Sequence, residues 1–346
     1  MPEDLQPRPP GEAFAPSASI PVPRLDAASP LLFVINAAAG AHDIEAKRAV
    51  IESALAACGR KGELLVCQPE ELPRVATEAA TAALARSTAV VAVGGDGSLS
   101  TVARAAHAAG CAMGVIPYGT FNYFARAHGI PTEPLAAARQ LLDARPTPIQ
   151  VASINERVFL VNASLGLYPD LLQDREAFKA RFGRSRWVAF VAAVATLLRA
   201  QRRLRLHIET GATVRDVQTL TLFVGNNPLQ LQQFGAEPED TVPGTPGDGS
   251  LAALVLRPIG TLALLGLMVH GAMGRLREAA GVESFEFTHM VVRPTLAPGH
   301  RKVVVACDGE VTRMRTPIDI RVLDTPLYLL RRDDAADTTP APRTVP

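Results

Sequence analysis

The sequence predicts an α/β fold with an N-terminal domain built on a parallel sheet and a second domain rich in antiparallel β-strands. Three observations predict it. The chain has 346 residues, enough for two domains of about 150 residues each. Up to about residue 148, short apolar runs alternate with helical patterns, and beyond it period-two stretches are separated by Gly, Asn and Pro. With 48% hydrophobic and 20% charged residues, the composition is that of a globular protein.

The first half consists of repeated strand–helix–strand units. Its strand candidates are uniformly apolar, as expected where helices cover both faces of a parallel sheet. This alternation assigns residues 30–148 to a first domain built on a parallel sheet. In chain order we expect a strand over 31–35, a helix carrying Val50, Ile51, Ala54 and Leu55 on one face, a strand over 63–67, a helix over 73–86, a strand over 89–93, a helix over 98–109 and a strand over 113–116.

The second half has the pattern of antiparallel strand pairs, interrupted by two helices at about 187–203 and 260–279. We assign residues 149–332 to this second domain and leave open whether its final strand returns to the first. The two ends, 1–29 and 333–346, are rich in Pro, Ala and Asp. Because they offer little to bury, we expect disordered tails there.

Charge and composition exclude several classes of protein. The 35 basic and 34 acidic residues give a net charge of +1, so the chain has no general attraction for nucleic acid. The four cysteines form no Cys-x-x-Cys pair, and we expect them to be buried thiols in a reducing compartment. No run reaches the roughly 18 to 20 apolar residues of a spanning helix, and the proline-rich start is unlike a secretory signal. A cytoplasmic protein is therefore expected.

A glycine-rich turn is the sharpest motif in the chain. It joins the strand at 89–93 to the next helix and consists of Gly94, Gly95, Asp96, Gly97 and Ser98. Glycines allow positive φ angles and a close backbone approach to a ligand, and a helix N-terminus attracts anions. The spacing fits neither the P-loop nor the dinucleotide fingerprint. The turn predicts a phosphate cradle, although a tight turn that binds nothing explains this segment alone equally well.

A second segment, GVIPYGTFNYFARAHGIP from Gly114 to Pro131, narrows the function. Together with the glycine-rich turn it resembles the diacylglycerol-kinase-type catalytic domain family, which includes bacterial lipid kinases, ceramide kinases and sphingosine kinases. The matching positions are Pro117, Gly119, Thr120, Asn122, Phe124, Ala125, Arg126, Gly129, Ile130 and Pro131. Other stretches are similar to family motifs at Asn36–Gly40, at Asn162, Ala163 and Gly166, at Asp248–Leu251, and at Asp308, Gly309 and Glu310.

The resemblance implies an ATP-dependent lipid kinase that transfers the γ-phosphoryl group to the hydroxyl of a lipid such as diacylglycerol and requires Mg²⁺. It implies that Glu310 accepts the proton, with Asp308 close by, and that Asp248 and the main-chain carbonyls of Thr245 and Ser250 hold magnesium. It also implies that residues 30–148 form the nucleotide-binding domain and residues 149–332 the lipid-substrate domain. The ATP-binding residues that it implies are Asn36, Gly94, Gly95, Asp96, Gly97, Ser98, Thr120 and Asn122. Considered alone, the Asp248 and Asp308 motifs are also compatible with plain turns.

The chain departs from the family pattern at three places. The turn at 36–40 lacks the family's Pro and Ser, Ser98 replaces a Thr, and Phe121 and Tyr123 stand where the family has a small residue and an Asp. These losses motivate a non-catalytic nucleotide- or lipid-binding relative as one alternative. A second alternative is an NAD kinase, because such enzymes share the glycine turn and carry an Asn-Glu dipeptide. Here Asn155-Glu156 lies between two alternating strands, where a hairpin turn is expected.

Basic residues concentrate in one segment, 175–205, which has nine basic residues and one acidic residue. One helical face of this segment carries Trp187, Phe190, Val191, Val194, Leu197 and Leu198. A basic amphipathic helix suits an anionic membrane surface, so we expect peripheral membrane association. A helix packed in the core would explain the apolar stripe equally well. The sequence identifies neither the lipid nor the oligomeric state, and a homodimer stays open.

Overall fold

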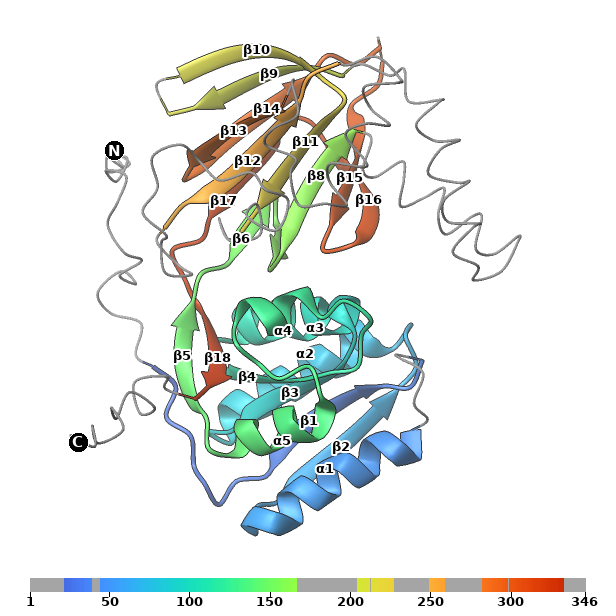
Figure 1. The fold of residues 1–346 in the computed structure, drawn as a ribbon, viewed down its shortest axis with the longest axis vertical. Coiled ribbons are helices and arrows are strands. Elements are labelled where there is room, and N and C mark those ends of the chain that lie inside the picture. Colours follow the sequence, from blue (N-terminus) through green and yellow to red (C-terminus); the bar gives the residue numbers. More distant parts are fainter. Residues whose placement is uncertain are drawn as a thin grey trace, which may run out of the picture. The chain divides into compact units, whose positions relative to one another are not determined.

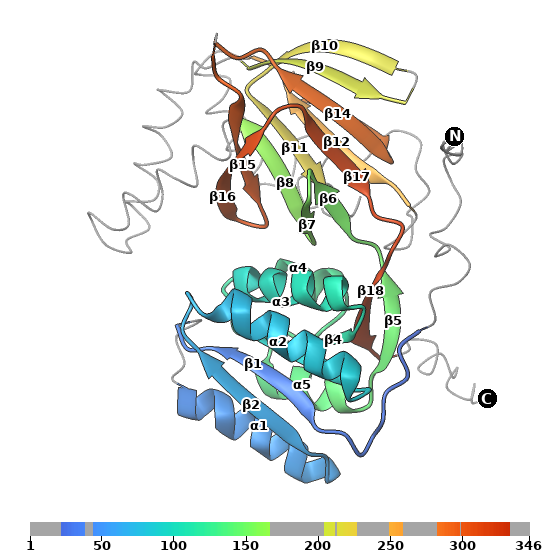
Figure 2. The same ribbon diagram turned by 180° about the vertical axis from the view of Figure 1, so that it is seen from behind.

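The computed structural model describes residues 22–38, 44–166, 204–211, 213–226, 249–258, 282–297 and 299–332. Contacts divide the chain into two compact units (Figures 1 and 2). The sheet unit extends to Ile149 and resumes at Leu327, whereas the β-rich unit runs from Gln150 to Pro326. One unit is α/β and the other antiparallel β, which confirms the predicted fold class. The helices expected at about 187–203 and 260–279 lie outside the described residues.

The sheet unit contains one six-stranded sheet and five helices. Its elements are β1 (Leu31–Asn36), α1 (Ile44–Cys58), β2 (Gly62–Cys67), α2 (Leu72–Ala85), β3 (Ala89–Gly94), α3 (Asp96–Ala109), β4 (Ala112–Pro117), α4 (Tyr123–Ala127), α5 (Pro134–Leu142), β5 (Arg145–Ile149) and β18 (Leu327–Arg331). The strand order is β2-β1-β3-β4-β18-β5. All neighbouring strands are parallel except β5, which pairs antiparallel with β18. The last described strand therefore lies in the N-terminal sheet.

Helices lie on both faces of the sheet (Figure 1). Because side chains alternate along a strand, each central strand packs against both helix layers. On one face, Leu31, Phe33 and Ile35 of β1 pack in a core with residues of α1 and α5. The opposite face is covered by α2 and α3. The buried positions of α2 are largely alanine, and those of α3 include Ser98, Ser100, Ala103 and Ala106. Small side chains let these two helices lie close to each other and to the sheet. The strands are apolar throughout because both faces are buried.

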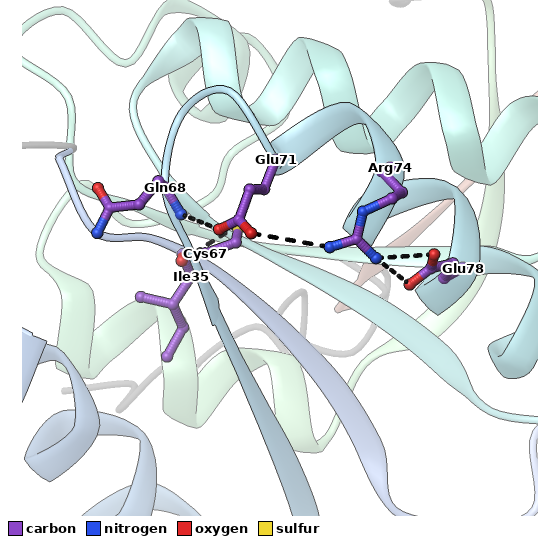
Figure 3. Close-up of polar contacts among 6 residues, drawn as sticks. All are labelled: Ile35, Cys67, Gln68, Glu71, Arg74 and Glu78. Carbon is purple, nitrogen blue, oxygen red and sulfur yellow. Dashed lines mark hydrogen bonds and ion pairs between the residues drawn. The ribbon is translucent and has the colours of Figure 1, made fainter.

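Polar contacts between residues close in the sequence stabilise the connection from β2 to α2 (Figure 3). The Glu71 carboxylate accepts a hydrogen bond from the backbone N–H of Gln68 at 3.1 Å, and Arg74 donates to Glu78 at 2.9 Å. The Cys67 thiol donates to the Ile35 carbonyl at 3.7 Å, and burial raises its pKa. The loop at this end of β2 is thus held by its own side chains.

Two expectations about local environment differ from the structure. Cys58 is exposed, whereas Cys67, Cys111 and Cys307 are buried as expected. The reason is that Cys58 ends α1, where the helix meets the surface.

Residues 22–29, which we assigned to the N-terminal tail, have a defined path. The backbone N–H of Asp26 donates to the Ser87 carbonyl at 2.7 Å, which ties this stretch to the end of α2.

The described residues of the β-rich unit form two six-stranded antiparallel sheets. Their strand orders are β10-β9-β14-β17-β6-β7 and β13-β12-β11-β8-β15-β16. One apolar core is shared by residues of both sheets, including Phe159, Leu165, Leu222 and Ile320. The strands are β6 (Ala152–Ile154), β7 (Arg157–Phe159), β8 (Asn162–Gly166), β9 (Leu204–Thr210), β10 (Thr213–Thr219), β11 (Thr221–Gly225), β12 (Leu251–Leu256), β13 (Val282–Phe287), β14 (His289–Pro294), β15 (Lys302–Cys307), β16 (Glu310–Arg315) and β17 (Ile318–Val322). Within the described parts of both units, no helix is long and apolar enough to cross a bilayer.

Candidate functional site

The carboxyl ends of β3 and β4 bring the two sequence motifs together. Gly94 and Pro117 end these strands and are paired in register. The backbone N–H of Tyr118 then donates to the Gly94 carbonyl at 2.8 Å, which extends the pairing by one residue. As a result, the glycine-rich turn and the segment that begins at Gly119 leave the sheet side by side.

The two turns approach each other through glycine backbones. A Cβ at Gly119 would stand 2.6 Å from the Asn122 Oδ1 and 3.1 Å from the Cα of Gly95. A Cβ at Gly95 would stand 3.4 Å from the Cα of Gly119. Contrary to our expectation, no glycine of the turn at 94–97 has a positive φ, and Gly95 is extended with φ −85° and ψ 178°. Glycine serves here to leave space rather than to permit an unusual conformation.

The first turn of α3 is the candidate anion-binding element at this edge. Gly95 is its N-cap residue, and no side chain caps the helix. The backbone N–H groups at such a helix start and the positive end of its dipole favour a phosphate group. Ser98, in the same turn, accepts a hydrogen bond from the Asn36 side-chain amide at 2.8 Å. This helix start, beside the two glycines, is therefore a candidate phosphate-binding site.

Asn122 shapes the second turn. It adopts a left-handed conformation with φ 51°, and its Oδ1 accepts the backbone N–H of Gly119 at 2.9 Å. Thr120 is exposed between them. The two residues that depart from the family pattern, Phe121 and Tyr123, are also exposed, and their rings stack with centroids 5.3 Å apart. Five of the predicted ATP-binding positions besides the glycines, namely Asn36, Asp96, Ser98, Thr120 and Asn122, thus belong to one end of one sheet.

A fully buried lysine lies beneath this end of the sheet. Lys47 of α1 has no exposed surface, and its Nζ donates to the main-chain carbonyl of Asn36 at 3.1 Å. The same Nζ lies 5.7 Å from the centroid of the Tyr118 ring. We did not single out Lys47 from the sequence. The sequence does contain a signal for its burial, because Lys47 occupies the first position of the apolar stripe that continues with Ile51, Ala54 and Leu55.

The titratable side chains next to α4 are unsuited to exchange protons near neutral pH. Burial lowers the pKa of His128 to about 3, and the charge of Arg331 adds to the effect. Its ring packs against Phe124 with centroids 4.6 Å apart. Burial also raises the pKa of Tyr118, with the carboxylate of Glu133 contributing. His128 is therefore a neutral packing residue at pH 7 and Tyr118 stays protonated.

Asp308 anchors a turn of the β-rich unit. Its carboxylate accepts three backbone N–H groups, from Leu160 at 3.0 Å, Val161 at 2.8 Å and Asn162 at 3.1 Å. In addition, the Asp308 N–H donates to the Asn162 carbonyl at 2.9 Å. The side chain is buried, and the residue has a left-handed φ of 48°. This geometry gives Asp308 a positioning role, because its oxygens are directed at the main chain.

Glu310 differs from Asp308 in its surroundings. It begins β16, its side chain is 45% exposed, and it forms an ion pair with Arg157 of β7. Arg157 is a second residue that sequence reasoning missed, since nothing in its neighbourhood along the chain distinguishes it from other surface arginines. Glu310 and Asp308 belong to the β-rich unit, and the glycine turns belong to the sheet unit.

A network of side-chain amides links the backbone corner that Asp308 anchors to the loop that we predicted to hold magnesium. The Gln150 side-chain amide donates to the carbonyl of Ser250 at 2.9 Å and to Asn226, and its Oε1 accepts the N–H of Gly249. Asn226 in turn donates to the Leu160 carbonyl at 3.0 Å. Asp248 and Thr245 lie outside the described residues. The described residues contain no cluster of three His, Cys, Asp or Glu side chains. The magnesium site at Asp248, Thr245 and Ser250 stays a prediction, because two of its three residues are not described.

Asn155-Glu156, the dipeptide that suggested an NAD kinase, is a turn between β6 and β7. Asn155 has a left-handed φ of 53°. Its side chain donates to the Arg315 carbonyl at 3.2 Å and accepts the N–H of Asp319 at 2.8 Å. Both ends of the Asn155 amide are thus used to join the turn to the neighbouring strands.

Comparison with known proteins identifies the N-terminal motifs. Residues 30–154 match the diacylglycerol kinase catalytic domain. This match confirms the resemblance found in the sequence, and it covers the glycine turns and the sheet that carries them. Two curated relatives are each described as a "probable lipid kinase YegS-like" protein. One, from Pseudomonas aeruginosa, is 38% identical over 131 residues, which are 36% of this chain and 42% of that protein.

The other relative, from Klebsiella pneumoniae, is 37% identical over 79 residues, or 22% of this chain and 27% of that protein. These alignments therefore span less than half of each relative's length. Solved structures extend the likeness of fold over both units. A "putative diacylglycerol kinase" of Bacillus anthracis superposes with a TM-score of 0.66 at 20% identity, over 88% of this chain and 97% of that one. A diacylglycerol kinase structure from the same organism gives a TM-score of 0.60 at 17% identity, with the same coverage.

The contacts of Asp308 predict a stability effect. In Asp308→Asn, an NH₂ group replaces one of the oxygens that accept backbone N–H groups, so at least one buried donor loses its acceptor. We expect the free energy of unfolding to fall by about 1–3 kcal/mol. Urea denaturation followed by circular dichroism measures it. The matched control is Glu310→Gln, which breaks only a partly exposed ion pair and should cost at most about 1 kcal/mol. Equal stability of Asp308→Asn and the wild type would contradict the positioning role.

Proposed function

We propose that this protein is an ATP-dependent lipid kinase. The observation that carries the proposal is the pair of glycine turns beside the uncapped start of α3, within the part of the chain that matches the diacylglycerol kinase catalytic domain. Backbone N–H groups and a helix dipole suit a triphosphate, whereas they offer nothing to an uncharged ligand. The contacts of Asn155 give no support to the NAD kinase alternative.

In the proposed reaction, the oxygen of a lipid hydroxyl attacks the γ-phosphorus of ATP. A new P–O bond forms, the bond between the γ-phosphorus and the β–γ bridging oxygen breaks, and ADP leaves. The hydroxyl proton passes to the carboxylate of Glu310, which we propose as the general base. Magnesium, when bound, would neutralise charge on the phosphates. The residues that carry out this chemistry are those that orient the phosphates, accept the proton and hold the lipid.

The glycine turn gives the first test of this function. In Gly95→Val, the branched side chain would fill the space beside Gly119 that the phosphates need. We expect the wild type to transfer phosphate from ATP to a component of a total lipid extract, detected by mass spectrometry, and the variant to lose this activity while keeping its fold. Ala108→Val, at the exposed far end of α3, is the control and should stay active. If the wild type binds ATP without phosphorylating any lipid, the protein is a non-catalytic relative and the proposal fails.

Glu310 has a separate test that distinguishes a base from an ion-pair partner. Glu310→Gln removes the proton acceptor, and we expect kcat to fall by about 10²–10⁴ with an unchanged Kd for ATP. Arg157→Met breaks the same ion pair but leaves the carboxylate in place. It should lower kcat much less. Equal losses in both variants, measured by steady-state kinetics, would assign the effect to the ion pair instead of proton transfer.

We further propose that the protein meets its lipid at an anionic membrane surface through residues 175–205, most of which lie outside the described part of the chain. The support is the charge of this segment, +8 in a chain whose net charge is +1. Each basic residue near an anionic surface contributes about 1 kcal/mol, so loss of three should weaken binding roughly a hundredfold.

Sedimentation with anionic vesicles tests this contact. We expect an Arg199, Arg202, Arg203 triple Ala variant to sediment less than the wild type, and the wild type to be released by high salt. The control removes equal charge from three exposed arginines of described strands, Arg313, Arg315 and Arg321. Salt-independent binding, or equal loss in both triple variants, would rule out this segment as the docking element.

A further inference from the structure

The buried ammonium of Lys47 is the charged group at the ATP end of the sheet that no sequence motif explains. It lies on α1 with no exposed surface, at a position where the other members of the stripe are apolar. Burial of an ammonium group is strongly unfavourable unless it is hydrogen-bonded and close to compensating charge or dipoles. A methionine or leucine would fill this position without that cost. The lysine therefore calls for a reason beyond packing.

Its contacts place the charge at the loops that form the phosphate cradle. Nζ donates to the carbonyl of Asn36, the last residue of β1, at 3.1 Å. The Asn36 side chain continues this connection to the Ser98 hydroxyl in the first turn of α3, at 2.8 Å. Tyr118, whose ring lies 5.7 Å from Nζ, directly precedes Gly119. Lys47 thus connects to the ends of β1 and β4 and, through Asn36, to the start of α3.

We propose that Lys47 is a positioning residue that supplies a fixed positive charge to the phosphate cradle and holds Asn36 against Ser98; this inference rests on the proposed kinase function. The hydrogen bond from Lys47 fixes the backbone carbonyl of Asn36. The Asn36 side chain is held as well, because its Oδ1 accepts the N–H of Ala38 at 3.0 Å. A charge buried under the cradle is poorly screened by solvent. It adds to the dipole of α3 and favours ligands in proportion to their negative charge.

The charge of the ligand is the readout that separates this role from simple packing. In Lys47→Met, a side chain of similar length and apolar character keeps the volume but removes the charge. We expect the Kd for ATP to rise at least about tenfold, with a smaller rise for ADP and AMP and no change for adenosine. Isothermal titration calorimetry on the full chain gives all four values. Lys61→Met, an exposed lysine next to β2, is the matched control and should change none of them.

Two further variants keep the proposal falsifiable if Lys47→Met does not fold. Lys47→Gln retains a donor for Asn36 without the charge and should also discriminate against ATP, while Lys47→Arg retains the charge and should keep the preference for ATP over adenosine. Wild-type affinity for ATP in a folded neutral variant, or equal weakening of ATP and adenosine binding, would overturn this inference alone. Failure of the wild type to bind ATP would overturn both this inference and the proposed function.

Discussion

A Cβ at Gly119 would stand 3.1 Å from the Cα of Gly95, and the rest of the candidate site is arranged around that close backbone approach. It requires β3 and β4 to end at the same level, which the pairing of Gly94 with Pro117 and the hydrogen bond from Tyr118 to Gly94 ensure. It also requires an amide side chain at Asn122, whose Oδ1 holds the Gly119 N–H. A side chain at Gly119 would push against Asn122 and Gly95 and separate the turns.

The β-rich unit depends on a comparable constraint at residues 160–162. Backbone groups at this corner between β7 and β8 would be left without partners by strand pairing alone, and such groups are costly when buried. Asp308 accepts the three N–H groups, and Asn226 donates to the carbonyl of Leu160. Through Gln150 the same network reaches Gly249 and Ser250. Residues that are distant along the chain therefore fix one another, and Glu310 follows directly from the anchored Asp308 and Gly309.

A polar residue in a family motif need not perform chemistry. The sequence placed Asp308 and Glu310 together as catalytic candidates, but the structure gives them different surroundings. Three main-chain donors occupy the carboxylate of Asp308, whereas Glu310 is half-exposed beside Arg157. Lys47 is the reverse case, because a residue outside every motif connects with the ends of two central strands. A motif thus marks some of the residues with unusual contacts in each unit and leaves out others.

The sequence by itself determined the class of the fold and the likeness of its first domain to the diacylglycerol kinase catalytic domain. Apolar runs at 31–35, 89–93 and 113–116 predicted buried parallel strands, since hydrophobic periodicity is local and survives without a structure. The glycine turns predicted a phosphate site because a few consecutive residues are enough to indicate a close backbone approach and a helix start. Only the tertiary structure decided that Gly119 is needed for space, that Asp308 binds main-chain amides and that Lys47 lies at the ends of β1 and β4. Those properties depend on contacts between residues far apart in the chain, such as Asp308 with Leu160, and a linear pattern does not encode such distances.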